Sequence, residues 1–261
     1  MERDPLGNLP VKDVTESHLR RWASRQRLSP HSLRKRLGFL HQLLRIHGSS
    51  VRYKLPALQR HDRRPLSPVE AAKVVAECLR STDRLERLGT LLCVQCGLRR
   101  SEAVGLRHED REGDGIRIRR AVVRVTGEIR VRARTKTAKS SGWVPLPPLL
   151  LSEIGNGTGY VLGDGKRPIV PDALTNAVKR VAGRVGVSVP HLGPHALRRT
   201  YGMALLEAGV DVVTAADLMR HDPRMLLEEY ARTRTDLKVD AIRRVFGDTP
   251  HDKPHGQVKG T

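Results

Sequence analysis

Leucines at helical spacing form the clearest pattern in the first part of the chain. One stripe recurs every three or four residues, as on the buried face of a helix, and consists of Leu33, Leu37, Leu40 and Leu44. Ser29-Pro30 precedes this stripe as a capping hydroxyl followed by proline in the first turn, and Gly48 ends it. A shorter helix before it carries Leu19 and Trp22. The pattern predicts a short helical domain over residues 1–58.

A second, larger domain is predicted after a charged linker at residues 59–66. Ser67-Pro68-Val69-Glu70 combines a capping box with proline in the first turn, which is a strong signal for a helix start. Helical spacing continues through residue 79 and again from 82 to 95, where Gly97 ends the run. Further helices are expected at 101–106, 149–154, 172–185, 194–208, 212–219, 224–230 and 236–246. The second domain is therefore predicted to span residues 67–247, followed by a disordered polar tail at 248–261.

Between residues 115 and 147 the apolar period changes to two, which is typical of half-buried strands. The alternating positions are Ile116, Ile118, Val123, Val125, Ile129 and Val131, interleaved with Arg117, Arg124, Arg130 and Arg132. Gly127 and the segment 139–142 mark turns. We predict a small antiparallel sheet of about three strands with one strongly basic face and with Lys136 near the tip of its last hairpin. The fold class is then mainly α with a small antiparallel β-sheet (α+β).

The charge balance indicates a polyanionic partner. Lys and Arg number 48 against 28 Asp and Glu, so the formal net charge is +20. Such an excess in a folded chain favours double-stranded DNA as partner, although a host with an arginine-rich proteome would also give a basic protein. A basic helix face can simply be solvated, but the scarcity of carboxylates in the first domain favours contact with phosphates. The positions expected to bind DNA are Arg34, Lys35, Arg36, Arg132 and Arg134.

Membrane and secretion signals are not recognised in the sequence. No apolar stretch approaches the roughly 20 residues that cross a bilayer, and the first residues lack the apolar core of a signal peptide. The three cysteines imply no disulfide framework, so we expect a cytoplasmic, nucleoid-associated protein without a membrane partner. Cys93-x-x-Cys96 could be a redox motif or half a metal site. Its place inside an apolar helical run favours buried free thiols.

Six side chains in the second domain suit chemistry on a phosphodiester: Arg99, Lys136, His195, Arg198, His221 and Tyr230. Two guanidiniums can each bind a phosphate through paired N–H donors, and together they could neutralise the equatorial oxygens of a five-coordinate phosphorus. His221 could donate a hydrogen bond to a non-bridging oxygen. No metal site and no cofactor are predicted, because the guanidiniums supply the charge that a metal supplies elsewhere.

A tyrosine is the candidate nucleophile. Its phenol has a reference pKa near 10 and needs a neighbour to take its proton, a task suited to His195. Attack by Tyr230 would form a phosphotyrosyl bond and expel a sugar hydroxyl, to which Lys136 on its hairpin could deliver a proton. Each of these residues alone could be ordinary, Arg99 a surface cation and Tyr230 a half-buried core aromatic. Their occurrence together in one order favours the catalytic interpretation.

A histidine pair at a spacing of four, His191 and His195, also resembles a metal-binding pair. Gly193 and Pro194 between them prevent a shared helical face, so we do not predict a metal there.

The chain resembles the tyrosine recombinase (phage integrase) family. The resemblance rests on four motifs in the family's order: Gly97-Leu98-Arg99-x-Ser101-Glu102, Thr135-Lys136-Thr137, His195-x-x-Arg198 and His221-x8-Tyr230. It covers residues 65–247 well and 14–58 loosely, as a helical core-binding domain. Arg220 stands where the family mostly has glycine, and Arg199 where a histidine is common.

The resemblance implies roles for these residues. Arg99 and Arg198 would clamp the scissile phosphate, and Glu102 would support Arg99 from behind. Lys136 would be the general acid, His195 the acid/base partner, His221 the stabiliser and Tyr230 the nucleophile. The family closes a C-shaped clamp around duplex DNA and assembles as a tetramer on paired sites, with the last helix, here 236–246, packing into a neighbouring subunit.

The leading hypothesis is therefore a site-specific DNA recombinase that works through a 3′-phosphotyrosyl intermediate and needs no ATP. A type IB topoisomerase would use the same residue types as a monomer, and a DNA-binding protein with a decayed site is a third reading. The complete polar set disfavours the third.

Overall fold

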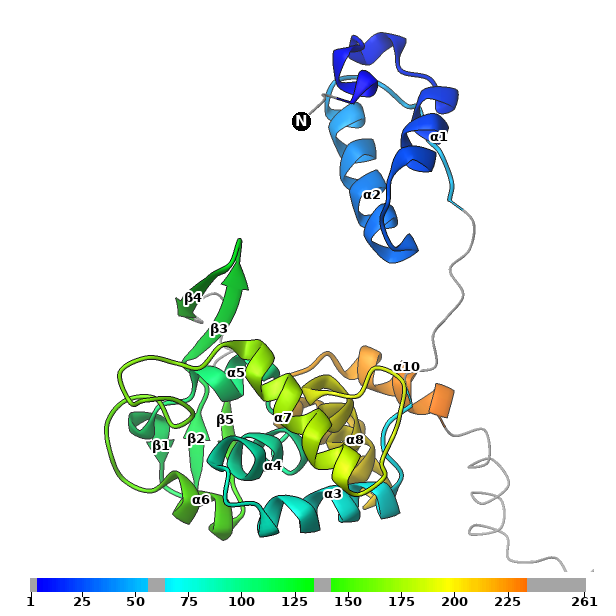
Figure 1. Ribbon diagram of the computed structural model, residues 1–261. Helices are drawn as coiled ribbons and strands as arrows, with labels where there is room; N and C mark the ends of the chain where they lie inside the picture. Colours follow the sequence, from blue (N-terminus) through cyan, green and yellow to red (C-terminus); the bar gives the residue numbers. More distant parts are fainter. Residues whose placement is uncertain (1–3, 56–63, 134–141, 234–261) are drawn as a thin grey trace, which may run out of the picture. The chain divides into compact units, whose positions relative to one another are not determined.

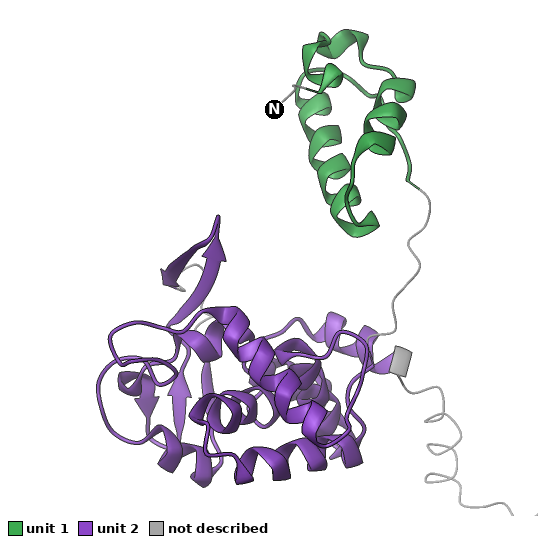
Figure 2. Ribbon diagram, viewed as in Figure 1, with its two compact units in different colours: residues 1–61 green, residues 62–261 purple. Residues whose placement is uncertain are grey.

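The computed structural model describes residues 4–55, 64–133 and 142–233 (Figure 1). The chain forms two compact units, Met1–His61 (unit 1) and Asp62–Thr261 (unit 2), shown in green and purple in Figure 2. The predicted positions of Arg134 and Lys136, the helix at 236–246 and the tail at 248–261 lie outside the described residues.

The described part of unit 1 consists, in chain order, of η1 (Pro5–Asn8), η2 (Val11–Asp13), α1 (Glu16–Arg25) and α2 (Pro30–Ile46). The predicted start of the longer helix is confirmed, because the Ser29 hydroxyl accepts a hydrogen bond from the first turn of α2 and Pro30 is its first residue. The buried cluster of this unit contains Val14, Leu19 and Leu44. Of the predicted leucine stripe, Leu37 and Leu44 are buried, and the other two are half-buried.

The helical elements of unit 2 are α3 (Pro68–Arg80), the π-helical turn η3 (Leu85–Gly89), α4 (Thr90–Val94), α5 (Arg100–Gly105), η4 (His108–Asp110), α6 (Pro148–Ile154), α7 (Pro171–Arg184), α8 (Pro194–Glu207), α9 (Val212–Met219) and α10 (Pro223–Thr233). The predicted capping box is confirmed, since the Ser67 hydroxyl accepts from Glu70 N and Glu70 accepts from Ser67 N. The single helix predicted for 82–95 is instead the turn η3 running directly into α4. Helix α4 contacts α3, α5, α7 and α8 and so lies at the centre of the unit (Figure 1).

The strands form two antiparallel sheets and not the single three-stranded sheet that we predicted. One sheet has the order β1 (Arg111–Glu112), β2 (Gly115–Arg117), β5 (Trp143–Pro145), and the other pairs β3 (Arg120–Val125) with β4 (Glu128–Ala133). Period-two alternation reveals strands but not their partners. Here β5 pairs with β2, and the hairpin of β3 and β4 stays separate from both.

The prediction of one strongly basic face is also wrong. In the β3–β4 register, Arg130 lies opposite Val123, whereas Arg124 lies opposite Ile129. Directly opposed residues share a face and successive residues alternate, so Arg130 and Arg124 point to opposite faces of the hairpin. Positive charge is therefore distributed over both faces, and every residue of β4 is exposed.

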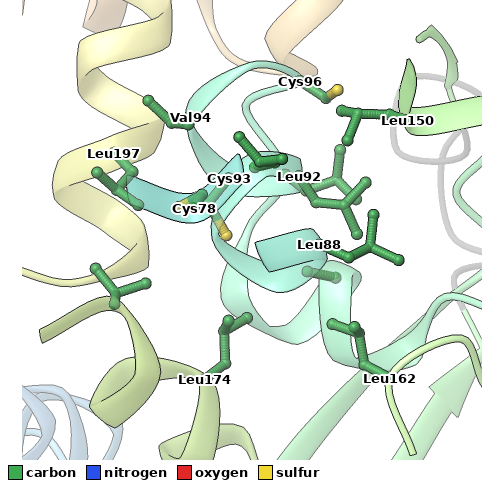
Figure 3. Packing of buried hydrophobic residues seen from close by; sticks show 14 of the residues in the cluster. Cys78, Leu88, Leu92, Cys93, Val94, Cys96, Leu150, Leu162, Leu174 and Leu197 are labelled. Carbon is green, nitrogen blue, oxygen red and sulfur yellow. The ribbon is translucent and has the colours of Figure 1, made fainter. Parts of the chain in front are cut away.

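The main core of unit 2 surrounds α4, whose residues are all buried (Figure 3). The three thiols Cys78, Cys93 and Cys96 are free and buried, as predicted. Burial raises the pKa of Cys78 and of Cys96 to about 12, and it raises that of Cys93 as well, so the thiols stay protonated at neutral pH. Within the described residues, no helix has both the length and the apolar character needed to cross a membrane.

A buried carboxylate joins the π-helical turn to α7. Glu86 accepts hydrogen bonds from Arg184 at 2.6 Å, from Arg180 at 2.7 Å and from the Ser81 hydroxyl at 3.0 Å. Arg184 also binds Glu77 of α3 at 2.6 Å. The hydrogen bond from Arg184, assisted by those from Arg180 and Ser81, lowers the pKa of Glu86 to about 2. This ion-pair network links three elements around the core.

Candidate active site

The first predicted arginine lies where α5 begins. Gly97 has a left-handed φ of +59° and reverses the chain after α4, and Arg99 then precedes the first residue of α5. Glu102 binds Arg99 twice, accepting its backbone N–H on Oε2 at 2.9 Å and its Nη1 on Oε1 at 2.7 Å. The Arg99 side chain is 25% exposed, so part of its guanidinium faces solvent.

The second predicted arginine is buried in the second turn of α8. Arg198 donates from Nη1 to the carbonyl of Gly97 and from Nη2 to the carbonyl of Met219, the last residue of α9. Its Nη1 also lies 3.8 Å from Oε2 of Glu102. Arg198 thus joins α8 to the segments that precede α5 and end α9.

The end of α9 brings a third arginine to the same place. Arg220 N donates to Asp217 O at 2.7 Å and His221 N to Ala216 O at 2.8 Å, the two bonds of a Schellman motif. Arg220 occupies the left-handed position of that motif with φ +52° and ψ +51°, where glycine is preferred because a side chain costs about 1–2 kcal/mol.

Arg220 contacts both Glu102 and Arg99. Its Nη2 donates to Oε2 of Glu102 at 2.8 Å, and its carbonyl accepts from Nη2 of Arg99 at 2.9 Å. We call Glu102, Arg99, Arg198 and Arg220 the arginine–glutamate cluster. Its three guanidiniums face one carboxylate, so two positive charges remain uncompensated within it. Such a surplus beside a partly exposed guanidinium suits an anion.

Glu102 remains ionised at the centre of this cluster. Its burial by itself raises the pKa, but the charges of Arg220, Arg99 and Arg198 outweigh that effect and lower the pKa to about 2. Removal of a buried carboxylate that accepts from this many donors would leave several of those donors without an acceptor. Glu102 therefore binds Arg99 and Arg220 together.

The two predicted histidines lie beside these charges. His195 is exposed in the first turn of α8; desolvation by its surroundings and the charges of Arg198 and Arg100 lower its pKa from the ordinary 6.5. His221 follows Arg220, and desolvation together with the charge of Arg198 lowers its pKa as well. Both rings are therefore neutral at neutral pH, so each can accept a proton.

Tyr230 lies on α10 and is half-buried. Its ring packs against a second cluster that contains Met203 of α8, Met219 of α9 and Leu226 of α10. An ion pair of 3.2 Å between Arg199 of α8 and Glu229 also fastens α10 beside the tyrosine. Arg199 thus contacts the residue next to the candidate nucleophile.

The predicted DNA-binding side chains that the structure describes divide into two groups. Lys35 and Arg36 on α2 and Arg132 on β4 are exposed. Arg34 is half-buried and donates to the carbonyl of Leu55 at 3.2 Å, so its guanidinium makes a hydrogen bond within unit 1. Arg134 and the candidate acid Lys136 lie outside the described residues.

Sequence reasoning missed two features of this site. The contact of Arg220 with Glu102 was not foreseen, although a non-glycine residue just past a predicted helix end was a signal for it. The second is Tyr201, whose ring covers Gly97 so closely that a Cβ there would clash with it. Gly97 is therefore required both by its φ and by this contact, and its carbonyl binds Arg198.

The sequence is similar to a known protein family and to named members of it. The model of the phage integrase family matches residues 65–236. The tyrosine recombinase XerA of Saccharolobus solfataricus is 26% identical over 260 residues, which cover 92% of this chain and 80% of that protein. The tyrosine recombinase XerC of Mycobacterium leprae is 30% identical over 210 residues, 77% of this chain and 64% of that protein.

Solved structures of low sequence identity share the fold. The Tn1549 transposon integrase in complex with a circular intermediate DNA superposes with a TM-score of 0.76 at 19% identity, covering 93% of this chain and 89% of that one. The XerH site-specific recombinase, bound to a palindromic difH substrate in a post-cleavage complex, gives 0.63 at 16% identity, covering 91% and 75%. The predicted fold class, a mainly helical catalytic fold with small antiparallel sheets, is confirmed by this likeness.

Proposed function

This chain belongs to the phage integrase family and is a tyrosine-type site-specific DNA recombinase, and from that premise we propose that Tyr230 is its nucleophile. The type IB topoisomerase alternative is not favoured, because the named relatives are recombinases. The observation that carries the proposal is the arginine–glutamate cluster, which places Arg99 and Arg198 around one carboxylate.

The cluster supports binding of the scissile phosphate. Arg198 uses donors of both terminal nitrogens on backbone carbonyls, and Arg99 uses one donor on each terminal nitrogen. A guanidinium has five N–H groups, so Arg99, whose side chain is 25% exposed, retains donors for phosphate oxygens. Because these guanidiniums are oriented before DNA arrives, they stabilise the charge that develops on the phosphorus oxygens without reorganising.

The covalent step then follows. The Tyr230 oxygen attacks the phosphorus, its proton passes to neutral His195, and the bond from phosphorus to the 5′-oxygen breaks. A 3′-phosphotyrosyl bond forms, and Lys136 gives a proton to the departing 5′-oxygen, which leaves as a hydroxyl. His221 donates a hydrogen bond to a non-bridging oxygen. The reverse sequence, with a different 5′-hydroxyl as attacker, rejoins the strand, and the conserved bond energy makes ATP unnecessary.

DNA binding would extend over both units. We assign phosphate contacts to Lys35 and Arg36 in unit 1 and to Arg132 on the β3–β4 hairpin, all exposed. We further propose a core-binding domain at 1–58, a linker at 59–66 and a catalytic domain at 67–247. Four copies would assemble on paired sites with the helix at 236–246 exchanged between neighbours, and the protein would be nucleoid-associated.

The proposal is tested by trapping the covalent intermediate. Sites are first selected from a randomised duplex pool. A selected site is then nicked so that the short fragment carrying the released 5′-hydroxyl diffuses away after cleavage. The wild-type chain should form a complex that survives a denaturing gel, and Tyr230→Phe should not. A wild-type chain that binds the selected site but never becomes linked to it would contradict the proposal.

A further inference from the structure

We propose that Arg220 is a positioning residue for cleavage, which holds Arg99 in its phosphate-binding orientation through Glu102 and through its own carbonyl. The inference rests on the proposed function, because it concerns the same phosphate site. It assigns a role to a side chain at a position whose backbone conformation favours glycine.

The backbone of Arg220 is the first observation. The residue adopts φ +52°, a region that side chains disfavour and that glycine occupies freely. Strained backbone persists where the surrounding contacts maintain it, and it gathers at functional sites. Glycine at this position would end α9 equally well, so the side chain must contribute something that the turn does not need.

The side chain of Arg220 is the second observation. Its side chain is only 1% exposed, whereas that of Arg99 is 25% exposed. Its guanidinium donates to Leu218 O at 3.0 Å and to Glu102 Oε2 at 2.8 Å. The Arg220 guanidinium thus contacts the same carboxylate that binds Arg99.

Two contacts make the position of Arg99 depend on Arg220. The carbonyl of Arg220 accepts from Nη2 of Arg99 at 2.9 Å, while Oε1 of Glu102 accepts from its Nη1 at 2.7 Å. Both terminal nitrogens of Arg99 are therefore fixed, and Arg220 takes part in each constraint. Rotation of the Arg99 guanidinium would break at least one of these bonds.

The aliphatic part of Arg220 also packs against Gly142, on β5's N-terminal side. A Cβ at residue 142 would lie 2.9 Å from Cγ and Cδ of Arg220, so glycine there leaves room for the arginine. This packing can be separated from the ion pair by substitution. Methionine keeps an unbranched apolar chain without charge, and lysine keeps a charge without the planar fork.

The experiment measures single-turnover cleavage at saturating protein, on the nicked duplex selected by the wild-type chain. The variants are Arg220→Gly, Arg220→Met and Arg220→Lys. Arg80→Ala, an exposed arginine at the end of α3, controls for loss of one positive charge. Arg220→Gly is expected to fold, because glycine suits the left-handed turn.

We expect Arg220→Gly and Arg220→Met to cleave roughly tenfold to a hundredfold more slowly, since misplaced reacting groups cost about that much. DNA affinity should match that of Arg80→Ala, and Arg220→Lys should recover part of the rate.

A merely structural role would lower the thermal midpoint and leave the cleavage rate of the folded variants unchanged, which would overturn the inference. Cleavage by Arg220→Gly at the wild-type rate would also overturn it. Failure of the wild-type chain to cleave at all would instead overturn the proposed function, so the two failures are distinguishable.

Discussion

Glu102 binds Arg99 through both carboxylate oxygens, one accepting the backbone N–H at 2.9 Å and the other the guanidinium at 2.7 Å. The same carboxylate thus caps the first turn of helix α5 and fixes the guanidinium of Arg99, the residue before that helix. Because a helix cap and a side-chain orientation share one residue, folding of α5 and preorganisation of Arg99 are coupled.

Replacement of this carboxylate should harm both stability and cleavage. Glu102→Gln leaves three buried or half-buried guanidiniums without a counter-charge, and removing one partner of a buried ion pair costs about 3–5 kcal/mol. Urea unfolding should show that loss, and covalent-complex formation should fall even where the variant is folded. Glu128→Gln, on the exposed hairpin, should change stability by less than about 0.5 kcal/mol. Equal stability of the two variants would contradict the cluster's role.

A methyl group at Gly97 should distort the site. Gly97→Ala introduces a Cβ at a left-handed φ and into the ring of Tyr201, so a conformational cost of about 1 kcal/mol is joined by about 1–3 kcal/mol of overpacking. Gly186→Ala is the matched control, because its φ is also left-handed at +68° but open space surrounds its Cβ. Thermal or urea unfolding should rank Gly97→Ala as clearly the less stable variant. Equal losses would show that the Tyr201 ring moves aside freely.

Acid should weaken the network around Glu86. Its folded pKa of about 2 lies below the ordinary 4.5, so its stabilising contribution is fully present above 4.5 and is lost as pH falls towards 2. Glu86→Gln should therefore cost about 1–3 kcal/mol at neutral pH, and the difference from wild type should shrink through that window. Urea midpoints of both proteins across the window provide the measurement. A difference that stays constant with pH would show that charge at Glu86 is not what stabilises the contact.

The pH profile of cleavage should depend on charges around His195. Desolvation and the charges of Arg198 and Arg100 lower its pKa, so the neutral, proton-accepting form persists below the ordinary 6.5. Arg100→Gln removes one of these charges, and the His195 pKa should rise, moving the acid limb of the cleavage rate to higher pH. Single-turnover rates and an NMR titration of the ring can be compared directly. An acid limb that does not move with the ring's pKa would exclude His195 as the proton acceptor.

Local signals were sufficient for most of the helices. Ser67 and Glu70 bond each other across one turn, and Ser29-Pro30 begins a helix with the expected cap, so a few neighbouring residues determine each of these starts. The π-helical turn before α4 was not predicted, because its residues follow the same apolar period as an α-helix. The pairing of β5 with β2 is a long-range contact, and the alternation of apolar residues does not predict it.

The candidate site residues were named from the sequence, but their contacts were not foreseen. Arg99, His195, Arg198, His221 and Tyr230 could be named from motif order alone. The bond between Arg220 and Glu102 joins residues 118 positions apart, and no local pattern encodes it. Arg198 binds the backbone carbonyls of Gly97 and Met219, and a pattern of side chains likewise does not predict such contacts.

Identification of the residue linked to DNA tests the central claim most directly. The trapped complex is digested with nuclease and trypsin, and the peptide carrying a nucleotide is sequenced by mass spectrometry. The chain has four tyrosines, Tyr53, Tyr160, Tyr201 and Tyr230. Cleavage after Arg224 and Arg232 isolates Tyr230 from the other three. We predict the nucleotide on Tyr230 within residues 225–232; a nucleotide on Tyr201 or on any other residue would contradict the account.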